Sequence, residues 1–290
     1  MNRCVTVKRL VPSLAVAGLA AALGYPAQAA PADGAAVLAP HRAVYDLKLL
    51  KSRGTRGVEA VRGRIVYDFS GSACAGYDLQ FRQVSELDSG EGKAVISEMS
   101  STTWEDGNAR KFRFNSQNKL NDKRADAVDG RAERTAKAVA VNLNKPKPRK
   151  LTVPAGAVFP TEHMRRILVA AREGQSILEF PVYDGSETGD KFYNTLTVIG
   201  REMAPDQKPA TDAAANIPAL ATLKRWPVSI TYFEQQDEKT ARSGEQTPAY
   251  SIAFEIYENG ISRALVLDYT DFTISAELSL LEMKTAKPCP

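Results

Sequence analysis

The stretch HRAVYDLKL, residues 41–49, alternates apolar and polar side chains along its length. Its apolar members are Ala43, Tyr45, Leu47 and Leu49. Successive side chains of a strand point to opposite faces of a sheet, so this period of two predicts a half-buried antiparallel strand. The same period recurs at 61–69 and 77–81, which favours a mainly β fold.

Later segments with the same alternation are also predicted as strands. They span 93–104, 109–115, 136–143, 177–183, 191–199, 226–235, 250–257, 262–269 and 271–283. Turn signals separate most of them, namely Ser89-Gly90, Asp106-Gly107, Asp129-Gly130, Asp184-Gly185 and Asn259-Gly260. The Asn-Gly pair is the strongest of these, because both residues tolerate the positive φ angles of a hairpin turn. We predict a proline-broken connector at 145–150 and a long surface loop at 204–222.

One helix is predicted, over residues 161–173. Thr161 is the expected cap and Gly174 the expected end. Met164, Ile167, Leu168 and Ala171 are spaced to form one apolar stripe. A single amphipathic helix among about a dozen strands has an evident place inside a curved sheet, or across its mouth. We therefore expect an antiparallel, open barrel that this helix plugs.

Residues 1–29 have the composition of a bacterial secretory signal peptide. A basic start precedes an apolar stretch, and Ala27-Gln28-Ala29 supplies the small residues of a cleavage site. The apolar stretch is about 15 residues long, short of the roughly 20 that a spanning helix needs. We expect residues 30–290 to form a single exported domain, and an uncleaved membrane anchor is the alternative.

Charge and cysteine usage both change when the leader is removed. The loss of Arg3, Lys8 and Arg9 leaves 35 basic against 34 acidic residues, a balance that argues against nucleic-acid binding. Cys4 is lost as well, so Cys74 and Cys289 remain. An even pair in an oxidising compartment is a candidate disulfide, and two unrelated thiols are the alternative.

Motifs that carry chemistry are scarce in this sequence. His41 is expected at an edge of the first strand, and His163 is expected to make a capping or strand-facing hydrogen bond rather than to act as a general base. Ser116–Lys119 matches the Ser-x-x-Lys of penicillin-recognising enzymes without the companion motifs. The acidic run 184–190 lacks calcium-loop spacing and is predicted as a solvated turn. We predict no catalytic residue, no metal site and no cofactor.

The order of several segments resembles the envelope-integrity protein B (EipB) family of alphaproteobacteria. The segments are the opening strand 41–47, Cys74, Phe159-Pro160-Thr161-Glu162-His163, Val182-Tyr183-Asp184-Gly185-Ser186-Glu187 and Cys289. Pro160, Thr161, Glu162, His163, Asp184 and Gly185 are the family-motif residues carried over. The resemblance covers roughly residues 40–290, and one departure is Tyr183, where relatives are expected to have Phe.

The resemblance implies a spiral-like, incompletely closed antiparallel β barrel with the helix as its inner spoke. It also implies a periplasmic location, a disulfide joining Cys74 to Cys289, and a role in keeping the cell envelope intact under cell-wall stress. A functional link to a periplasmic TPR-repeat protein follows from the same resemblance. The family provides no catalytic residues to transfer.

Three functions remain open from the sequence. The first is binding of a protein partner, for example at an exposed sheet edge. The second is carriage of a lipid or lipoprotein acyl chain inside the open barrel. The third, an enzyme acting on envelope polymers, is the least supported by the residues.

The disulfide is tested by counting thiols in the mature protein. Under denaturing conditions we expect no reactive sulfhydryl before reduction and two after it, because Cys74 and Cys289 are the only cysteines beyond the leader. Two reactive thiols in the unreduced, denatured protein would contradict the bridge.

Overall fold

The computed structural model describes residues 36–53, 57–90, 94–207, 217–235 and 246–286. The chain divides into two units, Met1–Asp33 and Gly34–Pro290, and the fold described here is that of the second. The predicted signal peptide and Cys289 lie outside the described residues, so the leader and the disulfide stay predictions. Cys74 lies in the short turn between the second and third strands.

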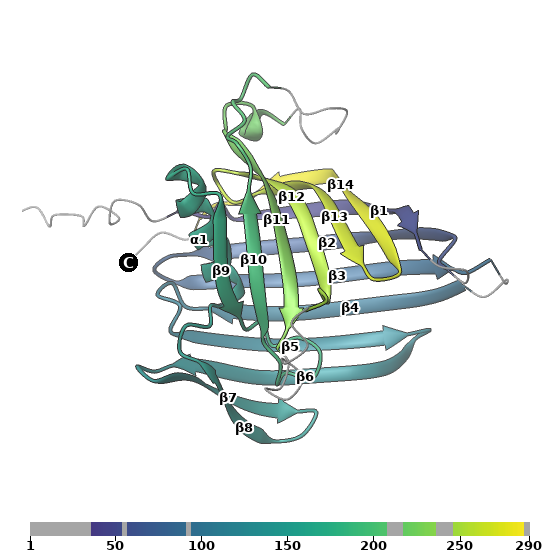
Figure 1. Cartoon of the computed structure of the whole chain (residues 1–290), viewed down its shortest axis with the longest axis vertical. Helices are drawn as coiled ribbons and strands as arrows, with labels where there is room; N and C mark the ends of the chain where they lie inside the picture. The colour runs from purple at the N-terminus through teal and green to yellow at the C-terminus, as the bar shows by residue number, and fades with distance from the viewer. Residues whose placement is uncertain (1–35, 54–56, 91–93, 208–216, 236–245, 287–290) are drawn as a thin grey trace, which may run out of the picture. The chain divides into compact units, whose positions relative to one another are not determined.

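The described part of the second unit is built on one antiparallel sheet of fourteen strands (Figure 1). The first eight strands are β1 (His41–Ser52), β2 (Ala60–Ser72), β3 (Gly76–Asp88), β4 (Ala94–Glu105), β5 (Lys111–Leu120), β6 (Lys123–Arg134), β7 (Ala138–Lys145) and β8 (Arg149–Pro154). The other six are β9 (Ile177–Val182), β10 (Tyr193–Ile199), β11 (Arg225–Glu234), β12 (Tyr250–Tyr257), β13 (Ser262–Tyr269) and β14 (Phe272–Met283). The mainly β prediction is confirmed.

Strand pairing joins the sheet in the middle and leaves it open at its ends. The order runs from β8 through to β1, then from β14 down to β9, because β1 pairs with β14. The two end strands, β8 and β9, are therefore not neighbours in the sheet. The sheet curls without closing, as expected for a spiral-like barrel.

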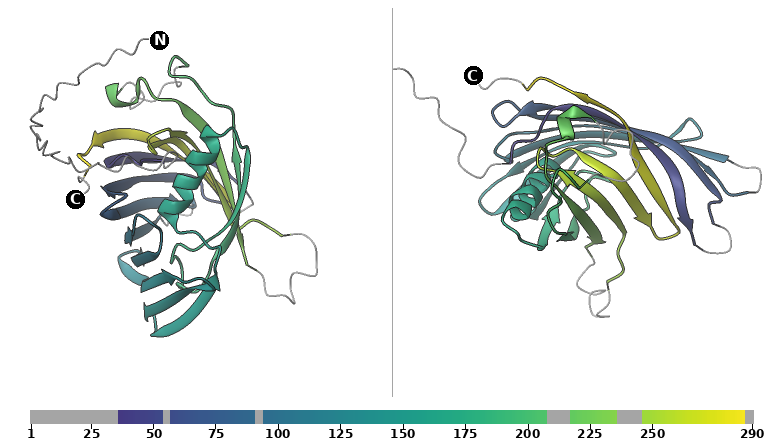
Figure 2. Two further views of the ribbon diagram at one scale, coloured as in Figure 1. Left: turned by 90° about the vertical axis from the view of Figure 1, so that its left-hand side faces the viewer. Right: turned by 90° about the horizontal axis from the view of Figure 1, so that it is seen from above.

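Helix α1 (Pro160–Arg172) lies against the concave side of this curl (Figure 2). Its apolar stripe packs on inward-facing residues of both halves of the sheet. Ile167 and Leu168, both fully buried, share one cluster with Tyr77 of β3 and Val228 of β11. The prediction of an inner amphipathic helix is confirmed.

A second core lies under β5, β6 and β7. Phe112 and Phe114 stack there on inward positions of β5, with ring centroids 5.4 Å apart. The cluster also takes in Phe159, just before α1, and Tyr183, just after β9. This core therefore joins the α1 region to the β5–β7 part of the sheet.

Three predictions about local structure were wrong. Strand β6 was missed and Asp129-Gly130 was predicted as a turn, because the inward positions of β6 carry small residues that leave a weak alternation. Gly130 has to be small, since a Cβ there would lie 2.6 Å from the Phe114 ring. Strand β8 was missed because its basic start, Arg149-Lys150, was assigned to a connector.

Two placements of loop and edge residues also differ from expectation. His41 is buried on β1, which lies between β2 and β14 and is not an edge. Its ring stacks on Tyr67, with centroids 5.5 Å apart. The run 204–222 is not a surface loop throughout, because it contains the short helix η2 (Pro218–Leu220), whose Leu220 is buried.

Two glycines with positive φ provide a matched test of the packing at Phe114. A Cβ on Gly185 (φ +67°) would lie 2.5 Å from the Phe114 ring, whereas a Cβ on Gly174 (φ +73°) meets nothing within 4 Å. We expect Gly174→Ala to lower the free energy of unfolding by about 1–2 kcal/mol, the cost of the backbone conformation alone. Gly185→Ala should lose a further ~1–3 kcal/mol from overpacking. If urea unfolding showed equal losses of unfolding free energy in the two variants, the close packing of Gly185 against the Phe114 ring would be contradicted.

Candidate functional site

The start of α1 is the place where the sequence-predicted motif residues gather. The segment 157–159 that leads into it is fully buried. Val158 forms a parallel bridge with Val182, because its amide donates to Pro181 and its carbonyl accepts from the amide of Tyr183. The Pro160–His163 motif and the Asp184–Gly185 motif thus lie on either side of one junction.

A buried carboxylate from β4 caps the helix. Glu105, which is 2% exposed, accepts hydrogen bonds from the backbone amides of Thr161 and Glu162, each at 2.8 Å. The first amides of a helix have no partner within the helix, and its N-terminus favours negative charge. Glu105 therefore supplies the missing acceptors.

The predicted cap at Thr161 was wrong. The helix begins one residue earlier, with Phe159 as the N-cap and Pro160 in the first turn. Thr161 takes part through its amide, which donates to Glu105. The predicted end of the helix at Gly174 is confirmed, since Gly174 adopts a positive φ directly after the C-cap residue, Glu173.

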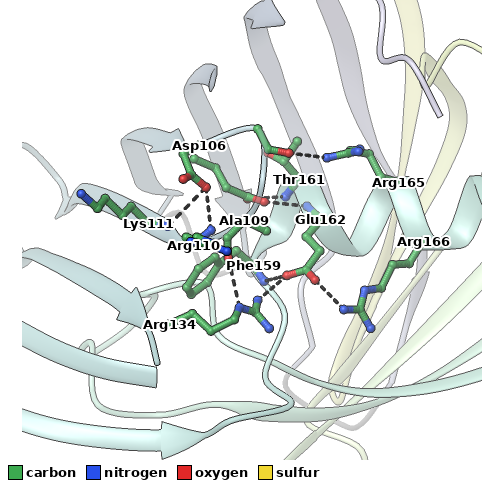
Figure 3. A network of polar contacts seen from close by, with 12 residues as sticks. Asp106, Ala109, Arg110, Lys111, Arg134, Phe159, Thr161, Glu162, Arg165 and Arg166 are labelled. Atoms are coloured by element: carbon green, nitrogen blue, oxygen red, sulfur yellow. Dashed lines mark hydrogen bonds and ion pairs between the residues drawn. The ribbon is translucent and has the colours of Figure 1, made fainter. Parts of the chain in front are cut away.

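A second carboxylate ties the same turn to the β4–β6 part of the sheet. Glu162 accepts hydrogen bonds from the guanidinium groups of Arg134 on β6 and Arg166 on α1, as Figure 3 shows. Arg134 also donates from Nε to the carbonyl of Ala109 at 3.0 Å, and its guanidinium lies 5.2 Å over the Phe159 ring. These contacts hold the helix start against the β4–β5 turn.

Burial governs the protonation of the groups at this junction. It raises the pKa of Glu105 to about 7, against the two amide hydrogen bonds, which lower it. Burial, with the charge of Arg166 as a smaller cause, lowers the pKa of His163 to about 4. At neutral pH the imidazole is therefore uncharged, while Glu105 is close to its midpoint of titration.

His163 does not make the hydrogen bond that we expected. Its Nε2 is buried without a partner, and its ring meets Phe180 edge-on with centroids 6.1 Å apart. The side chain packs between α1 and β9. The interpretation as a strand-facing or capping hydrogen bond was wrong for Nε2, since this atom is buried with no polar partner.

The 184–190 run is a turn, but it is only partly solvated. Gly185 and Gly189 are buried, whereas Glu187 and Thr188 are exposed. Burial raises the pKa of Asp184, whose side chain accepts a hydrogen bond from the Ser186 amide at 2.9 Å. The turn docks on the β5–β7 core, which a local pattern of acidic residues does not reveal.

Sequence reasoning missed Glu105 and Arg134, the two partners from the sheet. Glu105 occupies an inward position at the end of β4, next to outward Trp104. A carboxylate on the apolar face of an alternating strand is the signal that was available. Its partner amides lie more than fifty residues further along the chain, and nothing local points to them.

A depression of about 510 Å³ lies beside this network. Its lining includes Gly107, Asn108, Arg165, Arg166, Gln175 and Phe180. Arg166 pairs with Glu162 and lies 4.9 Å over the Phe180 ring, and Arg165 donates to the carbonyl of Gly107 at 2.8 Å. Both cations are thus engaged in fixing the helix. Among the described residues, no group of three or more His, Cys, Asp and Glu side chains is placed to hold a metal ion.

Fold and junction together define a class of protein: an antiparallel β sheet that curls without closing and holds one amphipathic helix on its concave side. The family model that describes EipB-like proteins matches residues 32–285. The chain belongs to the EipB-like family, as the sequence resemblance predicted.

A protein sequence and a crystal structure from Brucella abortus illustrate the similarity. The chain is 34% identical over 258 residues to the cell envelope integrity protein EipB of strain 2308, covering 89% of this chain and 88% of that protein. It also matches the crystal structure of a beta-barrel-like protein at 33% identity with a TM-score of 0.78, covering 87% of this chain and all of that one. In the part of the chain that the structure describes, no helix has the length and apolar character needed to cross a membrane.

Replacing the capping carboxylate tests how it titrates. Folding raises the pKa of Glu105 from 4.5 to about 7, so the folded state holds the carboxyl proton more tightly than the unfolded state does. This difference stabilises the fold fully below about pH 4.5, and the stabilisation is lost as the pH rises through about 7. We expect the free energy of unfolding of the wild type to fall relative to that of Glu105→Gln by about 3 kcal/mol between about pH 5 and about pH 8. Urea unfolding across this range measures it.

Glu277→Gln is the matched control, because Glu277 forms an exposed ion pair with Lys48. Its unfolding curve should follow that of the wild type at every pH. If the wild type and Glu105→Gln showed parallel pH dependence, Glu105 would not be the titrating group.

Proposed function

We propose that this chain helps to maintain the cell envelope from the periplasm, and that it acts by binding rather than by catalysis. The name of its Brucella relative and the predicted signal peptide support the location and the role. Glu105, a buried carboxyl whose pKa is raised to about 7, has both oxygens occupied by helix amides. That arrangement favours a structural rather than a catalytic use.

The ligand class that the geometry supports best is an acyl chain on the inner wall of the curl. Along β4 the inward-facing side chains become more exposed with distance from α1, from 2% at Glu105 to 38% at both Met99 and Val95. Along β5 the exposed fraction of the inward-facing side chains likewise rises, from 1% at Phe112 to 49% at Leu120. This gradient carries the proposal, because it leaves the apolar side chains of Val95, Met99 and Leu120 uncovered at the end away from the helix, among small polar side chains such as Ser97.

The number of strands in the sheet also supports an acyl chain as the ligand. A barrel of about eight strands has an interior just large enough for its own side chains, whereas fourteen strands enclose more. Inward aromatic residues remain only half-buried between the two ends. They include Tyr67, Phe81, Tyr232 and Tyr250. Apolar walls with a few polar groups are typical of sites for lipids and other apolar ligands.

A protein partner, such as a periplasmic TPR-repeat protein, is the second candidate. One observation favours it: Ile177 and Val198 form an exposed apolar pair on the outer face of β9 and β10, at 62% and 46% exposure. Pairing at the sheet edge has less support, since β8 and β9 are short and contain Pro154 and Pro181, which interrupt edge pairing.

Acyl binding is tested by titrating delipidated protein with a fluorescent long-chain fatty acid. We expect Met99→Lys and Leu120→Lys to raise the dissociation constant by about tenfold or more, because a charge in contact with the acyl chain is costly to desolvate. Ile177→Lys, on the outer face, is the matched control and should bind like the wild type.

Equal affinities in all variants, or no binding by the wild type, would contradict carriage. Recovery of a TPR-repeat protein by crosslinking in cells, lost in Ile177→Lys, would then favour the second candidate. Cleavage of peptidoglycan by the purified protein would overturn both.

A further inference from the structure

A row of polar side chains crosses the outer face of the sheet from β4 to β7. Trp104, Arg113, Arg131 and Asn142 follow one another in register on neighbouring strands. Arg113, Arg131 and Asn142 each lie between two buried residues and so point outward, and Trp104 shares their face as the cross-strand neighbour of Arg113. Neighbouring strands are about 4.8 Å apart, so the row presents an aromatic residue, two guanidinium groups and an amide at that spacing.

The two arginines face each other without a carboxylate between them. Arg113 and Arg131 are direct cross-strand partners and both are exposed. Like charges directly opposite one another on a sheet are destabilising. Among the described residues, no ion pair joins either arginine to a carboxylate within 4.0 Å. An anion bound between them would relieve this repulsion.

Arg113 is held in place by its neighbour on β4. Its guanidinium lies 4.2 Å from the centroid of the Trp104 ring. The indole in turn lies close over β3, where a Cβ on Gly76 would come within 2.8 Å of it. A guanidinium held against an aromatic face loses less side-chain entropy when it binds, so its free N–H groups are prepared for a ligand.

Two shallow depressions meet at this pair of arginines. One, of about 570 Å³, is lined by Trp104, Arg113, Arg131 and Asn142, with Lys111 and Glu133 at its side. The other, of about 450 Å³, shares Trp104 and both arginines and adds Thr102, Asn115, Asn144, Asp78 and Asp129. The surface is therefore elongated and mixed in charge.

The acidic side chains along the depressions decide between kinds of anion. Asp129 accepts hydrogen bonds from the amides of Asn115 and Asn144, at 3.1 and 2.6 Å, and Glu133 lies opposite Lys111. Carboxylates such as Asp78 and Asp129 would repel a dense polyanion, whereas they accept hydrogen bonds from hydroxyl groups. Amides and hydroxyls on the same surface match a ligand rich in hydroxyl groups.

We propose that the outer face of β4–β7 binds a linear glycan that carries carboxylates, with Arg113 and Arg131 clamping a carboxylate and the flanking amides holding sugar hydroxyls. Guanidinium groups bind carboxylates through paired, charge-assisted hydrogen bonds. This site is on the opposite face of the sheet from the acyl-binding wall, and the two proposals stand or fall separately.

Calorimetric titration of the mature protein with hyaluronan oligosaccharides, sugar chains with a carboxylate on every second ring, tests the clamp. We expect Arg113→Gln and Arg131→Gln each to raise the dissociation constant about tenfold to a hundredfold. Arg131→Lys keeps the positive charge but loses the forked guanidinium group. Its dissociation constant should therefore lie between those of the Gln variants and that of the wild type. Arg42→Gln, at an exposed outward position on β1, is the control and should leave the affinity unchanged.

The ligand class is tested by two further probes. The methyl ester of the same oligosaccharide should bind at least tenfold more weakly than the acid, because it lacks the charge. Polyglutamate, with a carboxylate on every residue, should bind more weakly than the hyaluronan oligosaccharides because Asp78 and Asp129 repel its denser charge. Equal or tighter binding of polyglutamate would overturn the glycan assignment, and equal binding by the arginine variants would overturn the site.

Thermal unfolding separates this role from a structural one. Arg131→Gln should melt at the same temperature as the wild type or higher, because it removes a like-charge pair. A clearly lower melting temperature would show that Arg131 has a stabilising partner within the fold, and this too would overturn the proposal.

Discussion

The cap that the Glu105 side chain provides for α1 is the contact on which this fold depends, because the strand pairing alone does not close the sheet. The end strands β8 and β9 are not neighbours, and helix α1 packs on inward-facing residues from both halves of the sheet. Glu105 fixes the start of that helix by accepting its first two free amides from the end of β4. The Val158–Val182 bridge and the Phe112–Phe159 stack act at the same place, so the two halves of the sheet are joined through the helix.

This arrangement divides the inner wall into two regions with different uses. At the helix end the wall is buried and polar contacts are satisfied, apart from a few atoms such as Nε2 of His163. At the far end the same strands present exposed apolar side chains. A closed barrel would have paired its edges and filled its interior, whereas an open sheet with a plug keeps one end accessible. The curl thus exposes apolar side chains on its inner wall at one end, and its outer face between β4 and β7 carries the Arg113–Arg131 pair.

Most strands were predictable because their alternation is local. Residues such as Ala43, Tyr45 and Leu47 identify a buried face without reference to the rest of the chain. The helix stripe was predictable for the same reason. Strand β6 was not, because Gly130 and Ala132 are small to make room for the Phe112 and Phe114 rings, and that need is visible only in three dimensions. The cap was missed for a similar reason: Thr161 is a good local candidate, but a carboxylate from a distant strand takes its place. The motif residues Pro160–His163 and Asp184–Gly185 were identified from resemblance, and their common location at the junction came from the structure.

The most direct test of this account is an NMR titration of the amide protons of Thr161 and Glu162. If Glu105 holds the start of α1, both resonances should move together with a single midpoint near pH 7, and both amides should be protected from exchange with solvent as strongly as those of the central strands. Amide resonances that do not respond to pH in this range, or that exchange freely, would show that the helix is held by something other than Glu105.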